Sequence, residues 1–239
     1  DRLLAIATLA DDLDVRLKLA TIYLVGGKPE LGRREVGFVL EREPKNLDGL
    51  ALLAGVAATP QEVDAAIQQV EAAQVALGNP ARLQLMLGAL YLKKQDLPRA
   101  ERAFQEAVTK EPKSVEAHLA LAIFYLSRRD SAQAEREFKV AAELAPVGSP
   151  AQMRLADFYF VSGKPDEAKR LLSETIQKAP DNLPARRRLA EIAFQERNYD
   201  DTLRTLEPIL KKNPSDVEAH LLRGRVRLGC PIPGLGKMV

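Results

Sequence analysis

One pattern repeats along this chain with a period of 34 residues, and no other feature constrains the fold as strongly. Two adjacent copies occupy residues 81–146, and each carries Leu, a small residue and Tyr, followed by Ala, Phe, Ala and Pro. These residues are Leu87, Gly88, Tyr91, Ala100, Phe104, Ala107 and Pro112 in the first copy, and Leu121, Ala122, Tyr125, Ala134, Phe138, Ala141 and Pro146 in the second. Self-similarity at a fixed period of this length predicts a stack of structural repeats.

The spacing within each copy predicts two helices joined by a turn. If the repeat is numbered from 1 to 34 with its proline at position 32, positions 4, 7, 8 and 11 share one face of a first helix. Positions 20, 24 and 27 form the matching stripe of a second helix. The proline follows the second helix, which it cannot continue. Position 8 is small in every copy, as close approach of two helix backbones requires; it reads Ala20, Ala54, Gly88, Ala122, Ala156, Ala190 and Gly224.

This pattern resembles the tetratricopeptide repeat (TPR), and the resemblance extends over residues 13–229. It implies an all-α fold, a right-handed α-solenoid or superhelix of about six helix–turn–helix repeats with flanking half-repeats. The expected segments are the end of a preceding repeat at 1–12, six repeats at 13–46, 47–80, 81–114, 115–148, 149–182 and 183–216, a final helix at 217–229 and an irregular tail at 230–239.

The second repeat, residues 47–80, departs from the pattern. Thr59-Pro60-Gln61-Glu62 has the sequence of a capping box with proline at the first helical position. We therefore expect its second helix to begin about a turn early and to run to Leu77. Ser149 and Gln152 predict another capping box at the start of the fifth repeat.

Composition and charge exclude several classes of function. Lys and Arg number 35 against 33 Asp and Glu, and this net charge of +2 gives no reason to expect nucleic acid as a partner. No segment is apolar for long enough to insert directly into a membrane. We interpret the chain as a piece of a longer protein because it begins at Asp1 without a start methionine. The compartment therefore stays open between cytoplasm and periplasm.

No catalytic, cofactor or metal site is expected. The only histidines, His118 and His220, both fall at position 4 and lie three repeats apart, so each is assigned to the helix-packing stripe. The only cysteine is Cys230, which excludes an intrachain disulfide and has no histidine nearby in the expected fold. Carboxylates interspersed with Lys and Arg on the second helices are typical of a solvated face. We predict that the chain is not an enzyme.

The resemblance implies that positions 5, 9 and 12 of the first helices face an inner groove. In the middle of the array these positions are largely apolar, which indicates a recognition surface, although adjoining first helices could equally shield them from solvent. Arginines beside this stretch could bind a carboxylate or phosphate of a partner, or could simply be solvated. The predicted groove residues are Leu85, Leu92, Leu119, Ile123, Leu126, Met153, Asp157, Phe160, Arg154, Arg187 and Arg188, with Glu191 and Phe194 at the next equivalent positions.

The resemblance implies a scaffold that binds a peptide or helical segment of a protein partner. One alternative is a structural spacer that self-associates weakly through its open repeat ends, and another is a regulatory array of a larger enzyme. The Ala- and Leu-rich helices are similar in style to long bacterial TPR arrays of envelope and exopolysaccharide export, including PEP-CTERM systems. The Lys and Asn pair with which some TPR domains hold the terminal carboxylates of chaperones occurs in none of the repeats at positions 5 and 9.

Overall fold

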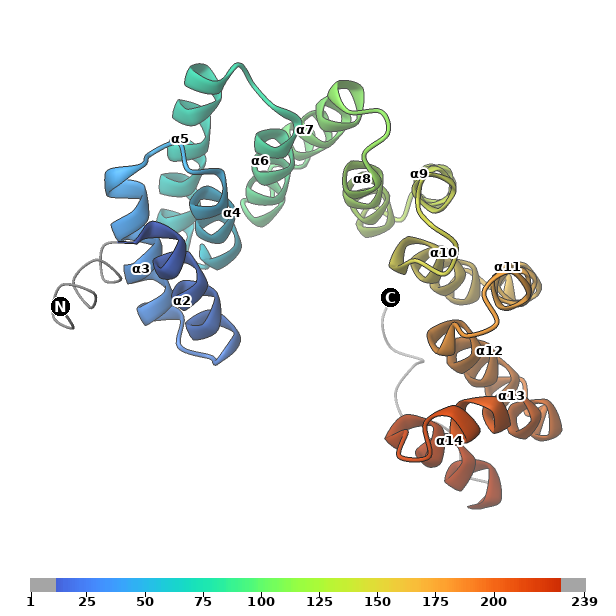
Figure 1. The fold of residues 1–239 in the computed structure, drawn as a ribbon. Helices are drawn as coiled ribbons and strands as arrows, with labels where there is room; N and C mark the ends of the chain where they lie inside the picture. The colour runs from blue at the N-terminus through green and yellow to red at the C-terminus, as the bar shows by residue number, and fades with distance from the viewer. Residues whose placement is uncertain (1–11, 229–239) are drawn as a thin grey trace, which may run out of the picture. The chain divides into compact units, whose positions relative to one another are not determined.

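The structure is a computed structural model that describes residues 12–228 (Figure 1), and the expected half-repeat at 1–12 and tail at 230–239 lie outside this range except for Asp12. Thirteen helices and no strands make up the described residues. They are α2 (Leu13–Val25), α3 (Pro29–Arg42), α4 (Leu47–Val56), α5 (Pro60–Leu77), α6 (Ala81–Lys93), α7 (Leu97–Lys110), α8 (Val115–Ser127), α9 (Ser131–Leu144), α10 (Pro150–Val161), α11 (Pro165–Lys178), α12 (Leu183–Gln195), α13 (Tyr199–Lys212) and α14 (Val217–Leu228). The predicted all-α solenoid is confirmed.

The chain divides into two compact units, an N-terminal unit that ends at Phe124 and a C-terminal unit that begins at Tyr125. Within each unit the helices follow one another as antiparallel pairs, coloured from blue to green in one and from green to red in the other (Figure 1). Among the described helices, none combines the length and the hydropathy that crossing a membrane requires.

Small residues at position 8 form the seam between the paired helices. Ala20, Ala122, Ala156 and Ala190 have no exposed surface. At Gly88 a Cβ atom would lie 2.6 Å from the Phe104 ring, so glycine lets the second helix place an aromatic residue directly on the first. A close-packed seam of this kind leaves no room for an added side chain.

Polar side chains begin most first helices at the same place in the repeat. The residue at position 34 caps the following helix by accepting a hydrogen bond from a backbone N–H two or three residues ahead. Asp12, Asn46, Ser114, Asn182 and Asp216 all do so. The second helices of three repeats begin in the same manner at Asp96, Asp130 and Asn198.

The turn between the two helices requires a left-handed backbone conformation in five of the six described repeats, the second repeat being the exception. Gly27 and Gly163 supply it with φ of 70° and 74°. In the equivalent turns Gln95, Arg129 and Arg197 adopt φ of 64°, 61° and 61° although they are not glycine. A side chain in this region costs about 1–2 kcal/mol, so these turns are imposed by the helices on either side.

The second repeat has the altered second helix that its sequence predicts. Thr59 and Glu62 form the complete capping box, and α5 has 18 residues where the other second helices have 14. The preceding helix α4 ends early, at Val56, and its final carbonyl groups need other partners. Lys93 of α6 supplies them, because its Nζ donates to the carbonyl oxygens of Ala54, Gly55 and Ala57 at 2.8, 2.8 and 2.9 Å.

Two sequence expectations need correction. The Ser149 side chain does accept from the Gln152 N–H, but the Gln152 side chain accepts from the N–H of Gly148 instead of Ser149, so the capping box is incomplete. His118 is buried, with Nε2 3.0 Å from the Pro112 carbonyl, as a packing residue should be. His220 is exposed instead, because the described residues include no second helix from the same repeat to cover this face of α14.

Candidate functional site

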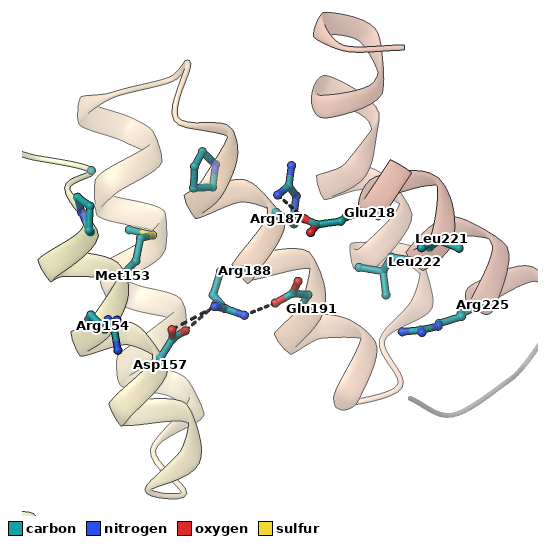
Figure 2. A pocket seen from close by; sticks show the side chains of 13 residues that line it. Met153, Arg154, Asp157, Arg187, Arg188, Glu191, Glu218, Leu221, Leu222 and Arg225 are labelled. Atoms are coloured by element: carbon teal, nitrogen blue, oxygen red, sulfur yellow. Dashed lines mark hydrogen bonds and ion pairs between the residues drawn. The ribbon is translucent and has the colours of Figure 1, made fainter. Parts of the chain in front are cut away.

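Three successive first helices of the C-terminal unit, α10, α12 and α14, line a pocket of about 690 Å³ (Figure 2). We call it the C-terminal pocket. Its lining combines apolar side chains with four arginines and three carboxylates. The residues are Gly148, Pro150, Met153, Arg154, Asp157, Pro184, Arg187, Arg188, Glu191, Glu218, Leu221, Leu222 and Arg225.

Local sequence signals fix the start of each of these helices. Ser149, Asn182 and Asp216 cap α10, α12 and α14 through their side-chain oxygens. Proline stands at one of the first two positions of α10 and α12. It suits the start of a helix, because the backbone N–H that proline lacks would have no intrahelical acceptor there. The pocket residues therefore lie on helices whose first turns are fixed independently of any partner.

Arg188 joins α12 to α10 across the middle of the pocket. Its Nε and Nη2 lie 2.6 and 3.1 Å from the two carboxylate oxygens of Asp157, a bidentate pairing, and its Nη1 lies 2.5 Å from Oε2 of Glu191. The dashed lines in Figure 2 follow this chain of contacts. A planar guanidinium held by two carboxylates has little freedom to turn toward a ligand.

Arg187 joins α12 to α14 in a similar manner. Its Nη2 lies 2.7 Å from Oδ2 of Asp216, and its Nη1 forms an ion pair with Glu218. Its Nε is buried and has no hydrogen-bond partner within residues 12–228. Asp216 therefore has two functions, since it caps α14 with one oxygen and pairs with Arg187 through the other.

Two carboxylates that pair with the pocket arginines have their pKa shifted in opposite directions. Burial raises the pKa of Asp157, and the nearby charges of Arg188 and Arg154 only partly offset this effect. The N–H of Ala219 and the guanidinium of Arg187 instead hold the pKa of Asp216 below its ordinary value. Burial alone would lower the pKa of Arg188, but Glu191 and Asp157 more than compensate, so the pKa rises.

Two pocket arginines have no such partners. Arg154 on α10 and Arg225 on α14 form no ion pair or side-chain hydrogen bond within the part of the chain that the structure describes. Apolar surface lies beside them, since Leu221 is 57% exposed and Met153 is half-buried. Leu222, by contrast, is buried in the cluster formed by α12, α13 and α14.

The pocket gathers five of the eleven residues that the sequence predicts for the groove, namely Met153, Arg154, Asp157, Arg187 and Arg188. Leu126 and Phe160 belong to the same unit but do not line the pocket. Leu85, Leu92, Leu119 and Ile123 lie in the N-terminal unit.

Of the predicted groove residues in the N-terminal unit, some are exposed to solvent and others pack against neighbouring helices. Ile123 is 43% exposed, whereas Leu92 and Leu119 are half-buried. Leu85 packs against the buried cluster of Ala81, Ala107 and Ala117, so the shielding alternative applies to it. Phe194, also expected to face the groove, is buried and its ring lies 5.7 Å from that of Tyr199.

Sequence reasoning missed the contribution of the last helix. Glu218, Leu221, Leu222 and Arg225 all line the pocket from α14. Leu221 and Arg225 fall at positions 5 and 9 of the seventh unit, so extending the groove positions by one more period would have found them. Among residues 12–228 no group of three or more His, Cys, Asp and Glu side chains could hold a metal ion.

Comparisons with known proteins agree with this architecture. Two tetratricopeptide repeat family models match residues 85–149 and 159–226, together more than half of the chain. A search of curated proteins found no match. Solved structures with a similar fold include a thermophilic TPR protein of Thermus thermophilus, which is 20% identical with a TM-score of 0.58 over 76% of this chain and 99% of that chain.

Two further structures have the same fold. PilW, described as a type IV pilus biogenesis factor, is 17% identical, with a TM-score of 0.60 over 88% of this chain and 97% of that chain. Yeast Tom70 is 16% identical, with a TM-score of 0.71 over 91% of this chain and 47% of that chain. At these identities the likeness concerns the fold alone. With the family models matched along both units, the chain belongs to the tetratricopeptide repeat superfamily.

Proposed function

We propose that this chain is a non-enzymatic interaction scaffold that holds a short helix or extended segment of a protein partner in the C-terminal pocket. TPR folds in general serve as scaffolds for protein–protein contacts and are typically without catalytic activity. The observation that carries the proposal is the pocket itself, where three first helices present exposed apolar surface beside unpaired arginines. Binding sites are usually concave and combine apolar surface with fixed polar groups; this pocket has both, with a larger share of charged side chains than is usual.

Peptides selected from a random display library against the whole chain would test this proposal. Leu221→Asp and Met153→Asp should each weaken binding of the selected peptides by roughly fivefold or more, because an interface anchor contributes over about 1 kcal/mol. Val161→Asp is the matched control, since Val161 is an exposed apolar residue of α10 outside the pocket. Unchanged binding by both pocket variants, measured by fluorescence anisotropy, would contradict the proposal.

The exposed apolar residues at the end of the N-terminal unit form a second proposed contact surface. Ile123 is the most exposed of the four predicted groove residues that lie in this unit. Ile123→Glu should weaken peptides that bind there while leaving peptides specific for the C-terminal pocket unaffected. Circular dichroism of the variant would exclude loss of helix as the cause.

Self-association through the C-terminal end receives less support. The face of α14 that would meet a further helix carries His220, Arg223 and Arg227, and Arg223 forms a hydrogen bond with His220. A Cβ atom at Gly224 would meet no described atom within 4 Å. Arrays commonly end in a helix with a polar outer face. The helix α14 fits that description only in part, because its apolar residues Val217, Leu221 and Leu228 are also exposed.

A further inference from the structure

We propose that the C-terminal pocket selects an acidic segment, with one carboxylate near Arg154, another near Arg225, and residues without negative charge between them. This inference rests on the proposed function and adds the chemistry of the partner. It also assigns recognition to the two outer arginines, while Arg187 and Arg188 act as structural links between helices.

The middle of the pocket already contains more negative than positive charge. Arg188 pairs with Asp157 and Glu191, and Arg187 pairs with Glu218, so two guanidinium groups face three carboxylates of the pocket lining, and the buried Asp216 also pairs with Arg187. A partner carboxylate placed there would meet like charge, and like-charge contacts are strongly unfavourable at an interface. The raised pKa of Asp157 is consistent with a crowded, partly desolvated group that would tolerate no further negative charge.

The outer walls have the opposite character. Figure 2 shows Arg154 on α10 and Arg225 on α14, on either side of the Asp157–Arg188–Glu191 contacts. Within residues 12–228 neither guanidinium is neutralised by an ion pair. Each can therefore bind a partner carboxylate without breaking an ion pair among the described residues, and the charge pattern across the pocket is positive, negative, positive.

Apolar contacts complete the complementarity. Met153 neighbours Arg154 on α10, and Leu221 lies one turn before Arg225 on α14. A segment with an apolar side chain next to each terminal carboxylate would bury these surfaces while its charges reach the arginines. Charge complementarity of this kind determines selectivity more than total affinity.

Positional isomers of one peptide test the inference directly. The probe is a short peptide of leucine and glutamine with one glutamate at each end, and its isomer has both glutamates in the middle. The two peptides have equal charge and composition, so any difference in binding reports the charge pattern. We expect the end-charged isomer to bind several-fold more tightly, and the difference to shrink as salt is raised.

Variants assign the effect to the two arginines. Arg154→Gln and Arg225→Gln should each reduce binding of the end-charged isomer by about two- to fivefold, the range for partly exposed ion pairs. Arg170→Gln is the matched control, since Arg170 is exposed on α11 outside the pocket. Asp157→Asn should improve binding of the isomer with central glutamates, because it removes a negative charge from the middle of the pocket.

The outcomes separate this inference from the proposed function. If the library yields no peptide that depends on Met153 or Leu221, the binding site itself is wrong. If such peptides are found but both isomers bind equally, or if the preference persists in both glutamine variants, the acidic-segment inference is overturned while the proposed function stands. A preference for peptides with lysine at the ends would also overturn it.

Discussion

The first helices of the two units share their packing positions but differ in the face formed by positions 5 and 9 of the repeat. In the N-terminal unit that face is mainly small or aliphatic, with Ala51, Gly55, Leu85, Ala89 and Ile123 at positions 5 and 9. In the C-terminal unit the equivalent face carries Asp157, Arg187, Glu191 and Arg225. Ion pairs of this charged face connect α10 to α12 and α12 to α14, whereas the ion pair that connects α4 to α6 in the N-terminal unit, Arg82 with Asp48, lies at position 2. The small residues of the seam determine how the two helices of a repeat pack. Residues at positions 5 and 9 are less constrained by this packing, so they can differ between repeats and contact a partner.

The largest effect should come from the face that the two units share. Ala122→Leu in one unit and Ala156→Leu in the other should each cost about 1–3 kcal/mol, because both residues are fully buried at the seam. Ile123→Ser, one residue from Ala122 but 43% exposed, should cost less than about 1 kcal/mol. Urea denaturation gives the order. A greater loss for Ile123→Ser would mean that the two faces have been assigned the wrong way round.

The next effect belongs to the C-terminal unit alone. Asp216→Ala removes both the cap of α14 and a partner of Arg187, and we expect it to cost about 1–2 kcal/mol at neutral pH. Asp216→Asn keeps the capping oxygen and should cost less. Because the pKa of Asp216 is lowered in the folded chain, its carboxylate stabilises the fold above the ordinary value of 3.8, and this contribution is lost as the pH falls through the lowered pKa. Denaturation curves of the chain and Asp216→Asn should therefore converge in acid.

Turn substitutions should affect both units alike and in the stabilising direction. Gln95→Gly and Arg197→Gly relieve a left-handed conformation that costs a side chain about 1–2 kcal/mol, while glycine adds a smaller entropic cost in the unfolded chain. We expect a gain of about 0.5–1 kcal/mol for each. A loss of stability in thermal unfolding would show that the side chains make contacts that outweigh the strain.

The smallest effect is expected at Asp157, whose pKa shift is opposite to that of Asp216. Since burial raises this pKa, the folded chain retains the proton more readily than the unfolded chain, and the contribution of Asp157 to stability declines as the pH rises above 3.8. Asp157→Asn should remove this pH-dependent loss of stability, and Arg188 would still pair with Glu191. At neutral pH the change in unfolding free energy should stay within about 0.5 kcal/mol. A large loss would show that the ion pair with Arg188 outweighs the burial of the carboxylate.

Helix order and the seam could be predicted because they depend on periodicity alone. The small residue at position 8, the capping box at Thr59 and the end of α5 at Leu77 all follow from spacing along the sequence. The first-helix caps were equally periodic, at position 34, and were not recognised because Asp, Asn and Ser alternate there with Pro80 and Gly148.

The pocket was less accessible to prediction because its contacts join different helices. Arg188 and Asp157 are separated by 31 residues and Arg187 and Asp216 by 29, so their pairing depends on side-chain reach between stacked helices and follows no single period. The same limit explains Phe194, which was expected to face the groove but packs its ring against that of Tyr199. Sequence pattern identifies the face of a helix, while rotamers decide what that face contacts.

The contact of Lys93 with the end of α4 has a consequence for how the chain is made. The carbonyl groups of Ala54, Gly55 and Ala57 accept from a residue of the third repeat, whereas the Val56 carbonyl accepts from Arg33 of the first repeat. During synthesis we expect the three hydrogen bonds of Lys93 to form only after α6 has emerged. If the chain were truncated between the second and third repeats, we would expect the C-terminal end of α4 to fray. A shortened chain for expression that contains the second repeat should therefore extend at least to Lys93.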